Sequence, residues 1–455
     1  MENEKFELPE AFVLRMRSQL GAEADAFFDS YRSPRAYGLR RNTQKLDREH
    51  FQQLMPWNLT QVPWAPEGYY YEPEDRPGRH VYHEMGLYYI QEPSAMSVAA
   101  IADPQPGEVI LDLCAAPGGK STQLAGRMNG EGLLVCNEIV PNRARILSQN
   151  IERMGIRHAV VLNHSPQELA KRFPLFFDRI IVDAPCSGEG MFHKEEAALQ
   201  EWSPENVQHC AERQREILSC AVSMLRPGGV LVYSTCTFAP QEDEEMIAWL
   251  LETEQELSIS PIDTQALGIS DADISGCARI YPHRQRGEGH FIAKLVKQGH
   301  PMPRPDAFSQ QTKRQTKKER PTDLWAGFDD FRKQSLSCEL IGKRCQFGEQ
   351  LYLVPPRMPD LTGLKVLRPG LHVGTNKKNR FEPAHALALA LRAEEVRQVC
   401  ETDEPEQFLR GMTLSCDGNL RGWVLVTYQG LPLGWGKANG GVVKNHYPKG
   451  LRINW

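Results

Sequence analysis

The sequence predicts an α/β fold built on a doubly wound, mostly parallel sheet, with further segments at both ends. Between about Pro104 and Val296, short apolar runs alternate with segments of helical period. This pattern is typical of a parallel sheet whose strands are buried on both faces. The chain also has 455 residues, too many for one ordinary hydrophobic core, so we expect two or three domains.

Four apolar runs are interpreted as buried strands, and a helix is expected before the last of them. The strands cover residues 109–113, 133–137, 179–183 and 230–234. In the helix, one apolar stripe is formed by Ile217, Leu218, Ala221 and Leu225. The RPGG sequence at 226–229 predicts the turn that closes this helix. Ligands of such sheets bind beyond the carboxyl ends of the strands, so residues after these strands are candidate site residues.

The regions around the sheet have different compositions and suggest domain boundaries. Residues 1–78 lean towards helix, and residues 79–299 form the predicted core. Residues 300–323 are rich in Pro, Gln and Lys, which is typical of a linker. Residues 324–455 combine β-like runs, turn glycines and one Ala/Leu-rich helix, which predicts a small α+β domain. We expect Trp435 and Tyr447 to be exposed on it.

The composition argues against several classes of protein. No segment approaches the roughly 18 consecutive apolar residues of a membrane span, and the acidic N-terminus lacks the features of a signal peptide. The eleven cysteines contain no C-x-x-C pair, so neither a disulfide framework nor a structural zinc site is expected. We therefore expect a cytoplasmic protein that uses no membrane and no metal. No heptad pattern demands a partner, so we expect a monomer.

The net charge of −5 does not by itself indicate nucleic-acid binding. Basic residues are nevertheless concentrated in places. Residues 31–45 hold five and residues 430–455 hold four, with no acidic residue in either stretch. Such local basic faces can follow a phosphate backbone on an acidic chain.

The segment VILDLCAAPGGKSTQLA (109–125) is interpreted as a strand, a glycine-bearing turn and a helix. The glycines let the backbone approach a ligand, and the helix N-terminus offers free N–H groups. A P-loop is excluded because Cys114 stands where its first glycine is required, and G-x-G-x-x-G is absent. What remains is the shorter turn typical of class I methyltransferases, after Asp112. Glu138, at the end of the next strand, is placed to accept hydrogen bonds from two ribose hydroxyls.

Two cysteines follow the ends of strands that we expect to be neighbours. Cys186 lies in DAPCSGEGMF (183–192) and Cys236 in STCTF (234–238), both polar and turn-forming. A thiolate that adds to C6 of cytosine makes C5 nucleophilic enough to take a methyl group. Asp183 can hold the N3/N4 edge of the base and favour protonation at N3. A base must then remove the C5 proton before the thiolate leaves.

These motifs resemble the Nop/Sun family of RNA cytosine-C5 methyltransferases, and within it the bacterial RsmF-type enzymes that act on 16S ribosomal RNA. The resemblance rests on CAAPGGK (114–120), NE (137–138), DAPCSGEGMF, RPGG-x-LVYSTCTF (226–238) and GEGHF-I-A (287–293). It extends to YYIQEPSAM (88–96) and, more loosely, to the tail GLPLGWGKANGGVVKNHYP. It implies a class I (Rossmann-like) methyltransferase core and S-adenosylmethionine (SAM) as the cofactor. The flanking regions become an N-terminal RNA-positioning domain and a PUA-like RNA-binding domain.

The resemblance also implies roles for single residues. Cys236 is the nucleophile that forms the covalent adduct with C6, and Cys186 assists elimination and release. The residues expected to contact the cofactor or the base are Cys114, Ala115, Ala116, Pro117, Gly118, Gly119, Lys120, Glu138 and Asp183. One position departs from the pattern. Many relatives carry an Asp near the adenine, where this chain has Ser165, so a hydroxyl replaces the usual carboxylate.

Several alternatives compete with 5-methylcytosine formation in 16S rRNA. DNA cytosine-C5 enzymes use the cysteine of the P-C motif as nucleophile, but the additional T-C cysteine favours the RNA class. An N6-adenine enzyme is disfavoured because Pro185-Cys186 does not match its motif. Transfer RNA remains open as a substrate, as do naked ribosomal RNA and the small ribosomal subunit. An RNA-binding assembly factor with secondary methylation is the alternative from another class.

Overall fold

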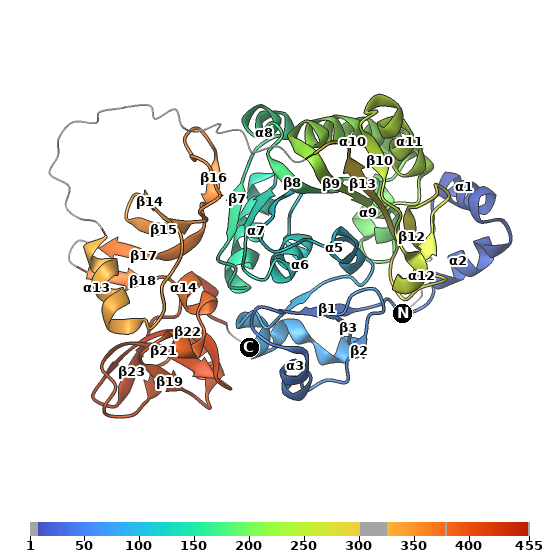
Figure 1. The fold of residues 1–455 in the computed structure, drawn as a ribbon. Helices are drawn as coiled ribbons and strands as arrows, with labels where there is room; N and C mark the ends of the chain where they lie inside the picture. Colours follow the sequence, from blue (N-terminus) through green and yellow to red (C-terminus); the bar gives the residue numbers. More distant parts are fainter. Residues whose placement is uncertain (1–7, 301–324, 378–379, 454–455) are drawn as a thin grey trace.

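The computed structural model describes residues 8–300, 325–377 and 380–453. Its centre is a ten-stranded sheet in the order β11-β12-β13-β9-β8-β5-β6-β7-β16, with β10 paired to β13 (Figure 1). The strands are β5 (Val109–Asp112), β6 (Leu133–Asn137), β7 (Ala159–Leu162), β8 (Phe177–Asp183), β9 (Leu225–Thr235), β10 (Leu257–Ile259), β11 (Ser270–Asp271), β12 (Ala278–Ile280), β13 (His290–Lys297) and β16 (Val366–Arg368). Residues 301–323 of the expected linker lie outside the described residues.

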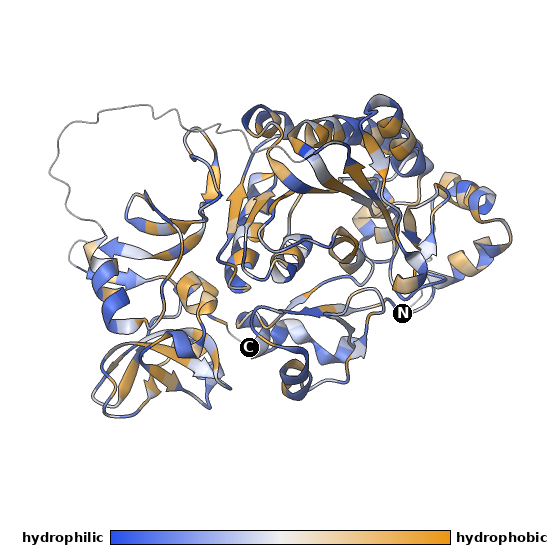
Figure 2. Ribbon diagram, viewed as in Figure 1, coloured by the Kyte–Doolittle hydropathy of each residue, from blue (hydrophilic) through white to orange (hydrophobic). Residues whose placement is uncertain are grey.

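The five central strands, from β9 to β7, run parallel and are covered by helices on both faces. The helices of this core are α5 (Met96–Ala102), α6 (Gly119–Arg127), α7 (Pro141–Arg153), α8 (Pro166–Arg172), α9 (Glu196–Glu201), α10 (Pro204–Met224), α11 (Glu244–Thr253) and α12 (Thr264–Leu267). Leu111 packs on the face covered by α8, α10 and α11, whereas its neighbour Ile110 packs on the face of α5, α6 and α7. Figure 2 shows these strands in the hydrophobic colour. The doubly wound fold and the four predicted strands are confirmed.

The predicted turn at 226–229 is wrong. Helix α10 contains the stripe of Ile217, Leu218 and Ala221, but β9 begins directly at Leu225 and includes the RPGG sequence. The pairing of β9 with β8 shifts its register beside these residues. The four residues therefore form an irregularity inside the strand, where Gly228 adopts a φ of +76° that glycine tolerates without strain.

The N-terminal region is mainly helical, as expected, and also contains a small antiparallel sheet. Its helices are α1 (Glu10–Leu20), α2 (Ala24–Ser30), α3 (Arg48–Leu54) and α4 (Val81–Glu84). Its antiparallel sheet has the order β2-β3-β1-β4, with β1 (Gly38–Arg41), β2 (Thr60–Gln61), β3 (Gly68–Tyr70) and β4 (Tyr88–Ile90). Because β4 pairs with β1, this sheet continues past residue 78, where the sequence suggested a boundary. Neighbouring tyrosines in β3 and β4 favour strands over helices.

The C-terminal region contains two sheets rather than the single small domain expected. One has the order β14-β15-β17-β18 and the other β19-β21-β22-β23-β20. The strands are β14 (Lys343–Phe347), β15 (Gln350–Val354), β17 (Leu371–Lys377), β18 (Arg380–Pro383), β19 (Val399–Glu401), β20 (Leu414–Ser415), β21 (Gly422–Tyr428), β22 (Leu431–Asn439) and β23 (Val442–Asn445). The helices are α13 (Ala326–Ser335), α14 (His385–Ala390) and α15 (Pro405–Leu409).

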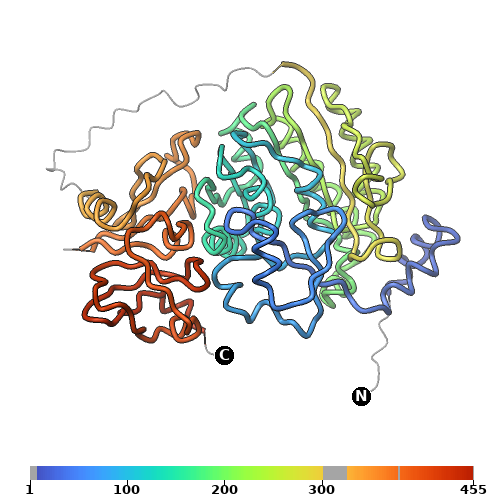
Figure 3. The backbone as a smooth tube through the Cα atoms, turned by 60° about the horizontal axis from the view of Figure 1, so that its bottom comes forward, coloured from blue at the N-terminus to red at the C-terminus, as the bar shows by residue number. Residues whose placement is uncertain are grey.

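The C-terminal region is attached to the rest of the molecule in two ways. Its strand β16 pairs antiparallel with β7 and so extends the edge of the core sheet. In addition, Tyr428 stacks on Tyr82 of the N-terminal region, with ring centroids 5.9 Å apart. Figures 1 and 3 place this region, in orange and red, beside the β7 edge of the core.

The expected exposure of Trp435 and Tyr447 is also wrong. Their side chains are only 1% and 3% exposed. The Trp435 indole N–H donates a hydrogen bond of 3.0 Å to the backbone oxygen of Ala384, and the Tyr447 ring packs edge-on against His385. Both side chains therefore hold α14 against the last sheet and are not available to stack on a nucleobase.

None of the helices in the described ranges combines the length and the apolar composition of a membrane span.

Candidate active site

A cavity of about 830 Å³ opens at the carboxyl ends of the central strands. It is lined by Cys114 after β5, Glu138 after β6, Asp183 at the end of β8 and Cys236 after β9. The chain order reverses between β5 and β8, and such a switch point is where ligands of doubly wound sheets bind. The volume lies within the range of small-molecule sites, about 300–1,000 Å³. All four sequence motifs thus meet at one site.

The two cysteines lie next to each other. Their Sγ atoms are 3.3 Å apart, because β8 and β9 are adjacent and pair Asp183 with Ser234. The hydrogen bond to Cys236 and burial together raise the pKa of Cys186 well above its usual value. Cys186 therefore keeps its proton at neutral pH.

Asp183 forms an ion pair at the side of the two thiols. Its Oδ2 accepts a hydrogen bond of 2.7 Å from Lys120 Nζ, and its Oδ1 accepts one of 2.9 Å from Ser234 Oγ. Burial would raise the pKa of Asp183, but Lys120 and His290 hold it well below its usual range. Burial likewise opposes the charge of Lys120, yet Asp183 raises the pKa of that ammonium. Both groups are therefore charged at neutral pH.

The glycine loop is held in place by hydrogen bonds to its backbone. Arg143 donates to the oxygen of Ala116 at 3.0 Å, and Asn150 donates to the oxygen of Pro117 at 2.9 Å. Gly118 caps α6 with a φ of +113°, and no side chain caps this helix. The first turn of α6 thus presents backbone N–H groups beside the cavity.

The acid before the loop is buried. Asp112 accepts a hydrogen bond of 2.6 Å from Ser121 Oγ, and burial raises the pKa of Asp112 to about 7. Glu138, after the next strand, is also buried but lines the cavity. Its Oε1 accepts from the Val140 N–H at 2.8 Å, and its Oε2 lies 3.5 Å from Arg143. Of the two acids predicted near the cofactor, Glu138 therefore lines the cavity and Asp112 does not.

The structure divides the predicted residues into two groups. Those that line the cavity are Cys114, Ala116, Glu138, Asp183, Cys186 and Cys236. Those that do not line it are Ala115, Pro117, Gly118, Gly119, Lys120 and Ser165. Lys120 is nevertheless joined to the site through its ion pair with Asp183. Among the described residues, no group of three or more His, Cys, Asp or Glu side chains is arranged to hold a metal ion.

Ser165 has a structural partner instead of a place in the cavity. It is the N-cap of α8 and forms a capping box with Glu168. Its hydroxyl accepts from the Glu168 N–H at 3.3 Å and also donates to the Glu168 carboxylate. The following residues, Pro166 and Gln167, line the cavity in its place. After β7, the cavity is therefore lined by Pro166 and Gln167 and not by Ser165.

Replacing Ser165 with alanine is expected to lower the free energy of unfolding by about 1 kcal/mol, since one helix cap is lost. The dissociation constant for SAM should change by less than about twofold. Thermal unfolding and isothermal titration calorimetry measure the two effects. A large loss of SAM affinity at unchanged stability would instead make Ser165 a direct contact of the cofactor.

Three polar residues of the site were missed by the sequence analysis. Arg143 and Gln167 line the cavity from the first turns of α7 and α8, and His290 lies 3.6 Å from Asp183. Arg143 and Gln167 each follow a strand of the sheet within six residues. This position could have identified them as candidates from the sequence. His290 lies in the GEGHF stretch, which was recognised only as part of the resemblance.

Comparison with known proteins decides the family. The ribosomal RNA small subunit methyltransferase F of Klebsiella pneumoniae (strain 342) is 34% identical over 461 residues, which cover 97% of this chain and 96% of the relative. An Escherichia coli protein of the same name is 33% identical over 468 residues, with the same coverage. The chain belongs to the RsmF family of 16S rRNA methyltransferases. Members of this family are SAM-dependent RNA cytosine-C5 methyltransferases.

The family matches also follow the observed architecture. Residues 8–93 match the N-terminal domain of 16S rRNA methyltransferase RsmF, and residues 99–296 match 16S rRNA methyltransferase RsmB/F. Residues 330–391 match the first C-terminal domain of RsmF, and residues 400–453 match its PUA domain. The two RsmF matches in the C-terminal region thus correspond to its two sheets. The match to the RsmF N-terminal domain includes β4.

Solved structures confirm the class I methyltransferase fold of the RsmF core. A methyltransferase homolog from Pyrococcus horikoshii is 30% identical with a TM-score of 0.57, covering 64% of this chain and 96% of its own. The structure of NSun6 from the same organism with SFG has a TM-score of 0.57 at 22% identity, covering 64% of this chain and 99% of its own.

Proposed function

We propose that this RsmF-family chain forms 5-methylcytosine in 16S rRNA through a covalent bond between Cys236 and C6 of the target base. The observation that carries the proposal is the distance of 3.3 Å between the sulfurs of Cys186 and Cys236. Both thiols line one cavity with the ionised Asp183. This set of groups suits addition to a pyrimidine ring followed by elimination. The names of the relatives support ribosomal RNA over transfer RNA as the substrate.

The residues around the cavity fit SAM, which supplies an electrophilic methyl group when bound. A Cβ at Gly118 would lie 3.1 Å from Leu147 of α7, so glycine lets the loop pack closely against that helix. Glu138 is placed to accept hydrogen bonds from ribose hydroxyls, and Gln167 lines the position proposed for the adenine. Cys114 and Ala116 of the glycine loop also line the cavity.

In the first half of the reaction, the Cys236 thiolate bonds to C6 and the C5=C6 π electrons move to C5. Carbon 5 then takes the methyl group. Asp183 stabilises this adduct because its carboxylate accepts hydrogen bonds from N4–H and from protonated N3. Lys120 keeps Asp183 ionised and oriented throughout. The base must leave its stack to reach Cys236, which the RNA-binding domains would assist.

In the second half, the C5 proton is removed and its electron pair re-forms C5=C6 while the bond between Cys236 and C6 breaks. Cys186 is the group best placed to take this proton. The largest cause of its raised pKa is the hydrogen bond to Cys236. That cause ends once the Cys236 sulfur is bonded to C6, so adduct formation favours release of the Cys186 proton to solvent, and the resulting thiolate can take the proton from C5.

RNA that contains 5-fluorocytidine tests the covalent step, since fluorine cannot leave C5 as a proton. In the presence of SAM, the protein should form a complex with such 16S rRNA that survives denaturing electrophoresis. Tritiated methyl transfer to unmodified 16S rRNA, to 30S subunits and to transfer RNA runs alongside as the substrate control. Methyl transfer to 16S rRNA without any trapped complex would overturn the covalent mechanism.

We propose a monomer that acts in the cytoplasm on rRNA or the small subunit and needs no metal ion. Neither thiol requires a metal to add to C6, and ribosomal RNA is the substrate named for the relatives. Light scattering with size-exclusion chromatography measures the oligomeric state, and activity in the presence of a chelator tests the metal requirement.

A further inference from the structure

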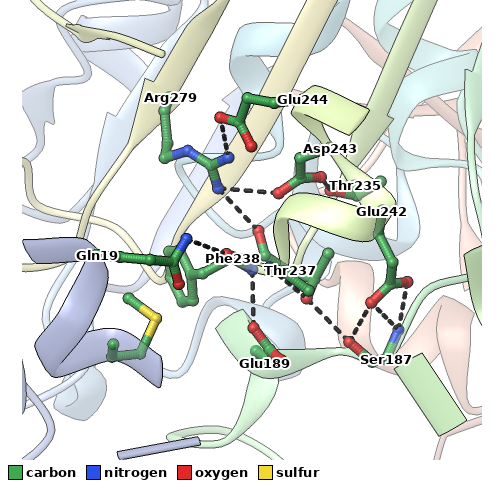
Figure 4. A network of polar contacts seen from close by, with 12 residues as sticks. Gln19, Ser187, Glu189, Thr235, Thr237, Phe238, Glu242, Asp243, Glu244 and Arg279 are labelled. Atoms are coloured by element: carbon green, nitrogen blue, oxygen red, sulfur yellow. Dashed lines mark hydrogen bonds and ion pairs between the residues drawn. The ribbon is translucent and has the colours of Figure 1, made fainter. Parts of the chain in front are cut away.

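The two loops that carry the thiols are joined behind the cavity by a buried network of polar contacts (Figure 4). Ser187 directly follows Cys186, and Thr237 directly follows Cys236. Their hydroxyl oxygens lie 2.9 Å apart, and both residues are buried. One hydrogen bond thus connects the residues next to the two sulfurs.

Glu242 anchors this connection from behind. Its carboxylate is fully buried and accepts hydrogen bonds from the Ser187 N–H at 3.0 Å, from the Ser187 hydroxyl and from Gln214 Nε2 at 2.8 Å. Gln214 also donates to the oxygen of Pro185, just before Cys186. The Cys186 loop is therefore held on both sides of the cysteine by groups that Glu242 organises.

The hydrogen bonds form a chain with one direction. The Ala239 N–H donates to Thr237 Oγ1, the Thr237 hydroxyl donates to Ser187 Oγ, and the Ser187 hydroxyl donates to Glu242. An ionised carboxylate can only accept, so it fixes this direction. Burial raises the pKa of Glu242 to about 7, while the donors from Ser187 and Gln214 oppose this rise. At pH 8 the accepting carboxylate therefore predominates.

A second buried acid braces the same two loops. Glu189, in the Cys186 loop, accepts from the Phe238 N–H at 3.0 Å and from Arg15 of α1 at 2.6 Å. Its neighbour Gly190 donates its N–H to the backbone oxygen of Cys236 at 2.8 Å. The outer parts of the loops are thus joined independently, so loss of the inner chain should shift the thiols without separating the loops.

We propose that Glu242 is a positioning residue of methyl transfer that sets the spacing of the Cys186 and Cys236 thiols through Ser187 and Thr237. Glu242 does not line the cavity, whereas Ser187 does, so Glu242 acts on the reaction only through the loops. This inference rests on the two-thiol reaction proposed above. Misplacement of reacting groups by about 1 Å can reduce rates about 100-fold, so the spacing is expected to appear in kcat.

Four variants test the proposal at pH 8. Glu242→Gln keeps the shape but removes the obligate acceptor, and Thr237→Val keeps the shape but removes the hydroxyl. Thr237→Ser restores the hydroxyl. Glu108→Gln is the matched control, because Glu108 is a partly buried carboxylate paired with Arg179 at the other end of the strands.

The readouts are kcat, KM and the rate of adduct formation with 5-fluorocytidine RNA. For Glu242→Gln and Thr237→Val, kcat and the adduct rate should fall at least about 10-fold, with KM for SAM and RNA unchanged. Thr237→Ser should recover most of this loss, and Glu108→Gln should lower the melting temperature without lowering kcat. A merely structural role would affect Thr237→Ser and Thr237→Val alike.

A wild-type adduct rate in Thr237→Val, or equal losses in both Thr237 variants, would overturn the proposal. If Glu242→Gln fails to fold, the comparison of Thr237→Val with Thr237→Ser still tests the proposal. Failure of the covalent mechanism itself has a different signature, because the wild-type protein would then form no adduct at all.

Discussion

Replacing Cys236 with alanine is expected to lower kcat for methyl transfer on the order of 10⁴-fold or more, as loss of a covalent nucleophile commonly does. No bond to C6 can form in this variant, so C5 does not become nucleophilic enough to accept the methyl group. We expect that Cys186 does not replace it, since its raised pKa disfavours the thiolate form. Tritiated methyl transfer to 16S rRNA measures the loss, and calorimetry should show unchanged SAM binding.

Two further variants control the Cys236 experiment. Cys220→Ala removes a thiol of α10 that does not line the cavity and should retain full activity. Cys236→Ser separates RNA-type from DNA-type chemistry, because an enzyme that uses the P-C cysteine as nucleophile would keep its activity. Substantial methylation by Cys236→Ser together with inactivity of Cys186→Ser would therefore reverse the assignment of the two sulfurs.

Replacing Cys186 with alanine is expected to lower multiple-turnover kcat by about 10²-fold or more while a covalent protein–RNA complex accumulates. Cys236 can still attack C6 and C5 can still be methylated, but the group that lies 3.3 Å away to remove the C5 proton is missing. A denaturing gel with labelled SAM should show the methyl label in the slowly migrating complex.

The double variant Cys186→Ala/Cys236→Ala provides the control for this complex, because it should form none. Another observation would contradict the assigned role of Cys186. If Cys186→Ala turns over slowly but forms no complex, then Cys186 contributes to addition rather than to elimination.

Much of the fold was predictable because it depends on local patterns. The apolar runs of β5, β6, β8 and β9 and the stripe of α10 were recognised from their periods and lengths. One wrong prediction also has a local cause. RPGG is a turn sequence that β9 absorbs as an irregularity. Trp435 looked exposed because its burial depends on α14, which lies 45 or more residues earlier in the chain.

The sequence by itself determined the chemistry: a glycine loop after a buried strand, an acid after the next strand and a cysteine after each of two later strands. These signals are local, since backbone conformation and strand burial impose them over a few neighbouring residues. Only the tertiary structure decided which side chains meet. Lys120 and Asp183 are 63 residues apart, Cys186 and Cys236 are 50 apart, and Ser187 and Glu242 are 55 apart. Such pairs are set by strand order and loop packing, which local sequence periodicity does not record.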